Sequence, residues 1–161
     1  MVSVDFVGRV NNTPLSPRQA LMPLLEAIFN SMQSIEEKGT GDGAITINVV
    51  RNTQNLLIRD DDQIRKSPIS GFEVVDNGVG FTKENFESFN TCDTQKKRNL
   101  GGKGVGRFLW LKAFEKVEIR SVFQEEETLF LRSFNYELNN DPVKNLRCEI
   151  EPNDSMVSTT I

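Results

Sequence analysis

The last third of the chain is a succession of β-type segments, and this succession constrains the fold more than any other feature. Strand-like runs cover 117–123, 128–136, 147–151 and 156–161. Two earlier runs rich in β-branched and apolar residues, 44–51 and 72–75, come after a long amphipathic segment. This order predicts an α+β domain, a two-layer sandwich in which helices cover one face of a mixed, mostly antiparallel sheet.

The amphipathic segment predicts a long helix from Ser16 to about Glu37. Ser16 is a typical helix cap, Pro17 suits the first helical position, and Gln19 can complete a capping box. Pro23 predicts either a kink or a late start of the regular helix. One apolar stripe recurs at three- and four-residue intervals and is expected to pack on the sheet. Its members are Leu21, Leu24, Leu25, Ile28, Met32 and Ile35.

Four further segments complete the local predictions. Apolar and polar residues alternate loosely over residues 2–10, which predicts a short edge strand, and residues 60–62 suggest an exposed loop or hairpin. The stretch 82–100 is polar and weakly structured, and a helix that opens within 101–108 is expected to run to about residue 114. The apolar residues of that helix are expected in the core: Phe108, Trp110, Leu111 and Phe114.

The composition is that of one folded domain covering residues 1–161, with 37% hydrophobic and 26% charged residues. The net charge of -4 gives no general attraction to nucleic acid or to anionic membranes. The absence of histidine excludes histidine-dependent triads and histidine-ligated zinc. Cys92 and Cys148 lack metal-binding spacing, and no signal peptide or membrane-spanning run occurs, so we expect a cytoplasmic protein without a membrane partner. Because the chain ends at an apolar strand, we also expect it to be the N-terminal fragment of a longer protein.

Glu26 and Asn30 are four residues apart on the expected helix and therefore project from the same face. A carboxylate that takes a proton from water and an amide oxygen that binds a divalent cation suit a metal-and-water site. An isolated pair of this kind is more often a solvated polar face, so the pair alone assigns no function.

A second motif, Asp76-Asn77-Gly78-Val79-Gly80, directly follows the second predicted strand. Gly78 and Gly80 allow the backbone to approach a ligand closely, and Asp76 can accept a hydrogen bond from an exocyclic amine. The alternative is an ordinary tight turn, for which Asp-Asn-Gly is equally typical.

The third motif is a glycine-rich run, 101–106, that leads into an apolar helix. Glycines before a helix N-terminus expose amide groups at the positive end of the helix dipole, and Lys103 adds a positive charge, so phosphate is the expected ligand. The spacing is neither that of a Walker A loop nor that of a dinucleotide-binding turn. The alternative is a flexible hinge.

Together and in this order, the three motifs resemble the GHKL superfamily (gyrase, heat-shock chaperone, histidine kinase and MutL), whose nucleotide-binding domain has the Bergerat fold. The resemblance covers residues 16–161. It implies that Glu26 is the general base, that Asn30 is the magnesium ligand and that Asp76 reads the adenine amino group. It also implies an adenine pocket shaped by Gly78 and Gly80, and a phosphate-binding loop made of Gly101, Gly102, Lys103, Gly104, Val105 and Gly106.

Two further assignments rest on the same resemblance. The stretch 82–100 would be the ATP lid, in which the basic cluster 96–98 either touches phosphate or keeps the lid solvated. Thr159 would be the threonine below the adenine. The chain departs from the family at Ser158, where a glycine is frequent, and at Gln33, where several relatives carry an acidic residue.

The function implied by the resemblance is magnesium-dependent ATP binding and slow hydrolysis, with lid closure driving a conformational or dimerisation switch. ATP and Mg²⁺ are the implied ligands, and a homodimer formed through downstream domains is the implied assembly; the client, protein or nucleic acid, stays open. A histidine-kinase catalytic domain and an ATP-sensing module with little turnover are the alternatives. Glu26 favours the ATPase, because hydrolysis needs a base.

Overall fold

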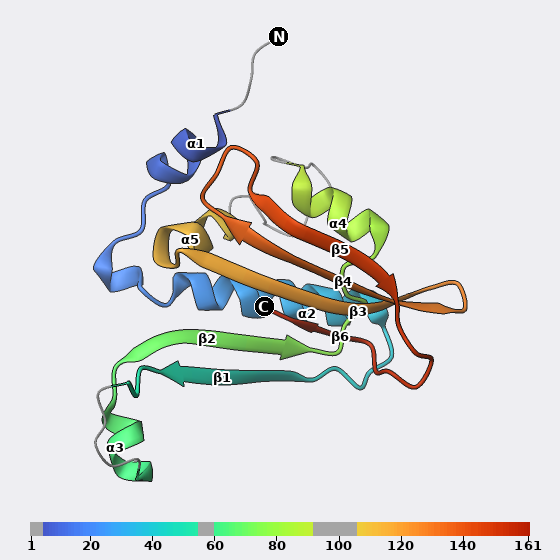
Figure 1. The fold of residues 1–161 in the computed structure, drawn as a ribbon, viewed down its shortest axis with the longest axis horizontal. Coiled ribbons are helices and arrows are strands. Elements are labelled where there is room, and N and C mark those ends of the chain that lie inside the picture. The colour runs from blue at the N-terminus through green and yellow to red at the C-terminus, as the bar shows by residue number, and fades with distance from the viewer. Residues whose placement is uncertain (1–4, 55–59, 92–105) are drawn as a thin grey trace.

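The computed structural model describes residues 5–54, 60–91 and 106–161, and it confirms the α+β class (Figure 1). The elements are, in chain order, α1 (Phe6–Asn12), the 3₁₀ turn η1 (Pro17–Gln19), α2 (Met22–Lys38), β1 (Ile45–Arg51), α3 (Asp61–Lys66), β2 (Ile69–Asp76), α4 (Lys83–Asn90), α5 (Gly106–Ala113), β3 (Lys116–Glu125), β4 (Thr128–Glu137), β5 (Val143–Ile150) and β6 (Ser158–Thr160).

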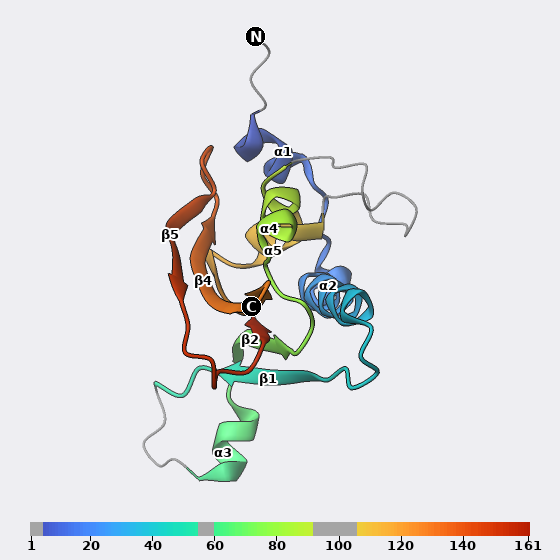
Figure 2. The same cartoon turned by 90° about the vertical axis from the view of Figure 1, so that its right-hand side faces the viewer.

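The six strands form one sheet in the order β1-β2-β6-β3-β4-β5. All five pairings are antiparallel, so the sheet contains no parallel pair among the described strands, although a mixed sheet was expected. Figure 2 shows α2, α4 and α5 together on one side of this sheet, which confirms the two-layer arrangement. The short strand β6 lies between β2 and β3, and it therefore brings the end of the chain to the middle of the sheet.

The long helix begins later than its cap. Ser16 and Gln19 form the predicted capping box around η1, but the regular helix starts at Met22 with Pro23 in its first turn. Pro23 therefore marks a late start, not a kink. The helix ends where predicted, at Gly39, whose φ of 67° closes the last turn in the left-handed conformation.

The predicted apolar stripe of α2 is only partly correct. The face that is fully buried carries Pro23, Ala27 and Ser31, residues four apart, whereas Leu21, Leu25 and Met32 are more than half exposed. Small side chains on the buried face let the helix lie close to the sheet. The larger apolar residues did not predict which face of α2 packs on the sheet. The helix is oriented by this close approach and by the hydrogen bond from Ser31 to Asp76 of β2.

Two predictions about local structure were wrong, because the segments concerned contain short helices. The stretch expected as an edge strand contains α1, because Asp5 accepts a hydrogen bond from the Gly8 amide (2.9 Å) and caps a helix that buries Phe6 and Val10. The region expected as a loop at 60–62 begins α3 in the same way: Asp60 accepts a hydrogen bond from the Gln63 amide (2.8 Å). In both cases the aspartate is a helix cap.

The polar stretch 82–100 begins with a helix, not with weak structure. Thr82 caps α4 by accepting a hydrogen bond from the Asn85 amide (3.2 Å). Phe86 and Phe89 then pack with ring centroids 5.2 and 5.6 Å from Phe134 of β4. Residues 92–100 of this stretch lie outside the described part of the chain.

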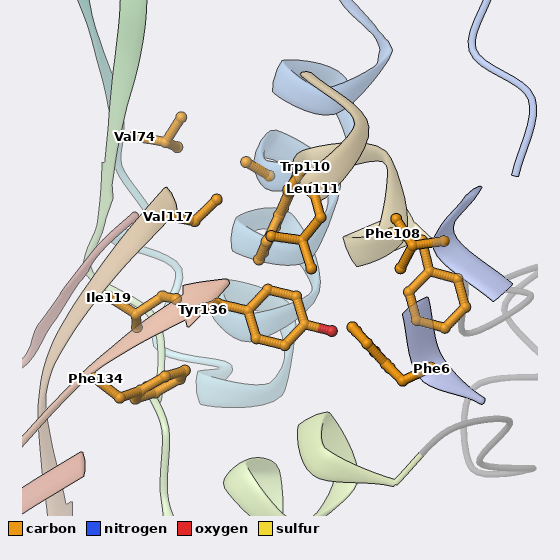
Figure 3. Close-up of a cluster of buried hydrophobic side chains, with 11 residues drawn as sticks. Phe6, Val74, Phe108, Trp110, Leu111, Val117, Ile119, Phe134 and Tyr136 are labelled. Atoms are coloured by element: carbon orange, nitrogen blue, oxygen red, sulfur yellow. The ribbon is translucent and has the colours of Figure 1, made fainter. Parts of the chain in front are cut away.

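The core lies between the sheet and the helices, and aromatic rings dominate it (Figure 3). Phe108, Trp110 and Leu111 of α5 are buried there, as predicted, and Phe114 packs against the same cluster. The indole Nε1 of Trp110 donates a hydrogen bond to the Pro23 carbonyl oxygen (3.0 Å). This bond joins α5 to the first turn of α2.

Candidate functional site

Asp76 ends β2 and is buried, with only 4% of the residue exposed. One carboxylate oxygen accepts a hydrogen bond from the Ser31 hydroxyl (2.7 Å) and the other accepts one from the Gly78 amide (2.9 Å). Burial raises the pKa of Asp76 above its ordinary value, and these two hydrogen bonds oppose the shift. Each oxygen keeps a free lone pair, so the carboxylate can still accept a bond from a ligand N–H group.

Thr159 lies directly opposite Asp76, because β6 pairs with β2 in that register. The two side chains therefore share one face of the sheet. On its other side β6 pairs with β3, and Thr159 faces Ser121 with 2.9 Å between their hydroxyl oxygens. The structure thus brings together Asp76 and Thr159, two predicted site residues that are far apart in the sequence.

The loop after Asp76 is seated against α2 and β3 at its glycines. A Cβ on Gly78 would lie 2.6 Å from the backbone carbon of Ser34, and the amides of Val79 and Gly80 donate to the carbonyl and hydroxyl oxygens of Ser34. Gly80 has a φ of +77°, and a Cβ there would lie 2.6 Å from Ser121 Oγ. Both glycines are therefore required by packing within the protein, a reason that differs from the expected approach to a ligand.

Asn77 has a structural role in the Asp-Asn-Gly motif, as the tight-turn alternative implied. Its side chain accepts a hydrogen bond from the Ala44 amide (2.7 Å) and donates one to the Asp42 carbonyl (2.9 Å). The Lys38 ammonium group donates to the Asn77 carbonyl (2.8 Å). Asn77 thus joins the end of β2 to the loop before β1, and it leaves Asp76 as the residue of this motif that faces the site.

Glu26 and Asn30 lie on the flank of α2 and are both partly buried. The Glu26 carboxylate lies against the first residue of α5, so closely that a Cβ on Gly106 would overlap it. Burial raises the pKa of Glu26 above its ordinary value. The predicted base therefore lies beside Gly106, the last residue of the glycine-rich run.

The remaining predicted phosphate-binding residues, and the basic cluster 96–98, lie outside the described part of the chain. These phosphate-binding residues are Gly101, Gly102, Lys103, Gly104 and Val105. Residues 5–54, 60–91 and 106–161 contain no group of three or more His, Cys, Asp or Glu side chains that could hold a metal ion by themselves. A cation at Asn30 would thus need oxygen ligands from a bound phosphate, and this donor set fits Mg²⁺, which prefers one or two protein ligands with substrate phosphates.

A cavity of about 650 Å³ lies next to this site but is separate from it. It is lined by the end of α2, the start of α4 and the end of β3, and Gly78 and Val79 form one wall. Glu26, Asn30, Asp76 and Thr159 are not among its lining residues. The loop 77–80 divides the two regions.

Sequence reasoning missed four polar residues that support the site: the buried Ser31, Ser121 and Arg132, and the partly buried Ser34. The available signal was a polar residue at an inward position, such as Ser121 between Ile119 and Phe123 in the alternation of β3. The Arg132 guanidinium lies between the rings of Phe86 and Phe123 and donates to the Thr82 carbonyl (2.8 Å). It therefore holds the start of α4 to β4.

The six-stranded antiparallel sheet and the helices on one side of it define a two-layer α+β fold (Figure 2). A solved structure with this fold is that of the ATPase and transducer domains of DNA topoisomerase II from Balamuthia mandrillaris, with a TM-score of 0.56 and 12% identity. The match covers 88% of this chain and 36% of that chain, so the chain spans about a third of the length of that protein. At this identity the likeness shows the fold. No protein-family model matches the chain, and no curated protein sequence matches it.

Across residues 5–54, 60–91 and 106–161, no helix has the length and apolar character needed to cross a membrane.

Proposed function

We propose that this chain binds ATP with Mg²⁺ and hydrolyses it slowly. The observation that carries the proposal is the buried Asp76 carboxylate, which is held by two donors, lies opposite Thr159 and is not neutralised by a basic side chain in any described ion pair. A buried carboxylate without a basic partner is costly, and carboxylates of this kind are frequent at ligand-binding sites. An exocyclic amine, such as the amino group of adenine, is a donor of the required kind.

In the proposed reaction, Glu26 takes the proton of the attacking water. The new bond forms between the water oxygen and the terminal phosphorus, the bond to the bridging oxygen breaks, and ADP and phosphate leave. The raised pKa of Glu26 supports this role because it makes the carboxylate a better proton acceptor than an ordinary glutamate. Mg²⁺, held by Asn30 and the phosphates, would neutralise charge on the phosphates.

The proposal extends to the segment 82–100 as a lid over the nucleotide and to a dimerisation switch. Its support is the described start of the segment, where Arg132 donates to the Thr82 carbonyl and fixes the residue from which α4 begins. Size-exclusion chromatography with light scattering, with and without a non-hydrolysable ATP analogue, tests the switch. A nucleotide-dependent increase in mass supports dimerisation, and an unchanged mass contradicts it.

The experiment that tests the ATPase is phosphate release by the wild-type protein and by Glu26→Gln, with Glu36→Gln as the control. Glu36 is on the same helix but exposed, away from Gly106. Glu26→Gln should keep ATP binding and lose at least a hundredfold in turnover, whereas Glu36→Gln should match the wild type. If Glu26→Gln hydrolyses ATP at the wild-type rate, Glu26 is not the base.

A further inference from the structure

Two buried hydroxyl groups in the centre of the sheet have a defined hydrogen-bond direction. Ser121 is fully buried and Thr159 is 3% exposed, and their oxygens are 2.9 Å apart. Ser121 Oγ also accepts the amide proton of Phe81 at 2.9 Å. The geometry between two hydroxyls is compatible with either donor, so the direction follows from the other partners of each group.

A hydroxyl group has one proton to donate, and a buried proton needs an acceptor. The Phe81 amide already occupies one lone pair of Ser121 Oγ. Within the described part of the chain, Thr159 Oγ1 is the acceptor within hydrogen-bond distance of the Ser121 proton. If Thr159 donated instead, the Ser121 proton would be left over on the fully buried residue. If Ser121 donates, the proton left over is that of Thr159, which lies opposite Asp76, where a ligand can accept it. Ser121 therefore donates to Thr159.

This direction leaves the Thr159 proton available to a ligand. No direct hydrogen bond joins Thr159 to Asp76 among the described residues, although the two lie opposite each other on one face. The site thus presents a donor, the Thr159 hydroxyl, beside an acceptor, the Asp76 carboxylate. Adenine carries an amino donor next to a ring-nitrogen acceptor on its pairing edge, whereas guanine carries a carbonyl acceptor next to an N–H donor.

We propose that Ser121 is a positioning residue that sets base specificity: by fixing Thr159 as a donor, it makes the site select adenine over guanine. The inference rests on the proposed nucleotide-binding function and adds to it a residue that acts through Thr159. A site whose buried polar groups are left unpaired by the wrong ligand discriminates strongly against that ligand. Without Ser121 the Thr159 hydroxyl can rotate and accept, and the penalty against guanine falls.

The test is calorimetric titration with non-hydrolysable analogues of ATP and GTP, in the presence of Mg²⁺. For Ser121→Ala we expect the ratio of ATP to GTP affinity to fall at least tenfold relative to the wild type. Ser121→Thr keeps the hydroxyl and should keep the ratio. Ser67→Ala is the matched control, because Ser67 is also buried and its hydroxyl also makes a hydrogen bond, but at the end of α3.

A double-mutant cycle separates specificity from a structural effect through Phe81. Thr159→Val removes the donor, so adding Ser121→Ala to it should leave the ATP-to-GTP ratio unchanged. An ATP-to-GTP ratio in Ser121→Ala equal to the wild-type ratio overturns the role of Ser121 while ATP binding stands. If the wild-type protein binds neither nucleotide, the proposed function fails and the inference fails with it.

Discussion

Gly80 and Gly41 offer a matched test of how tightly the site loop is packed. Both have nearly the same left-handed backbone, with φ of +77° and +76°. A Cβ on Gly41 would have no heavy atom within 4 Å, whereas a Cβ on Gly80 would lie 2.6 Å from Ser121 Oγ and 3.2 Å from Phe123 Cβ. Alanine at either position has the same backbone cost, so the difference between the variants isolates the steric cost.

The expected magnitudes follow from these distances. Gly41→Ala should reduce the free energy of unfolding by about 1 kcal/mol, the cost of a left-handed alanine. Gly80→Ala adds overpacking of about 1–3 kcal/mol, and disturbance of the Ser121 hydrogen bonds costs about 1 kcal/mol more. Urea unfolding followed by the fluorescence of Trp110, which is the single tryptophan and is buried, measures both variants. If the two variants lose the same free energy of unfolding to within about 0.5 kcal/mol, the usual error for additive effects, the packing described here is refuted.

Three further predictions concern the proposed chemistry. Gly106→Ala should displace the Glu26 carboxylate and lower ATP turnover at least tenfold, with an unchanged or slightly higher melting temperature because alanine favours a helix; a wild-type rate in a phosphate-release assay would contradict this. Asp76→Asn should weaken ATP binding roughly 10- to 100-fold by calorimetry, since a hydrogen bond to a charged group is lost. Burial raises the pKa of Asp76, so the contribution of Asp76 to stability is present at acid pH and is lost as the pH rises through the raised pKa. At neutral pH, Asp76→Asn should therefore unfold at a denaturant concentration equal to or higher than that of the wild type. A clearly lower midpoint would contradict this expectation. Because the pKa of Glu26 is also raised, the turnover rate at saturating ATP should fall on acidification at a pH above the ordinary value of 4.5; a rate profile without such an acid limb would count against Glu26 as the base.

The sequence predicted the fold class because its signals were regional. The strand runs, the capping box at Ser16 and the helix end at Gly39 each depend on residues close together in the chain. The errors arose where a local pattern had two meanings. Asp5 and Asp60 were treated as ordinary polar residues, although each caps a helix, and alternation alone cannot separate these short helices from a strand or a loop.

The candidate site was predictable only in part, for a related reason. Asp76 and Glu26 could be chosen from motifs, because Gly78 and Gly80 mark the first position and Asn30, four residues further on the same helix, marks the second. Ser121 and Arg132 could not, because their importance comes from long-range neighbours: Ser121 contacts the Gly80 loop and β6, and Arg132 lies between rings from α4 and β3. No spacing in the sequence encodes which strands become adjacent.

The central claim is that the region around Asp76, Thr159 and Glu26 binds an adenine nucleotide. Calorimetric titration of the protein with a non-hydrolysable ATP analogue, with and without Mg²⁺, tests it most directly. We expect saturable binding at one site per chain, and we expect Mg²⁺ to strengthen it. Absence of measurable heat at millimolar nucleotide, for protein shown to be folded by its urea transition, would contradict it.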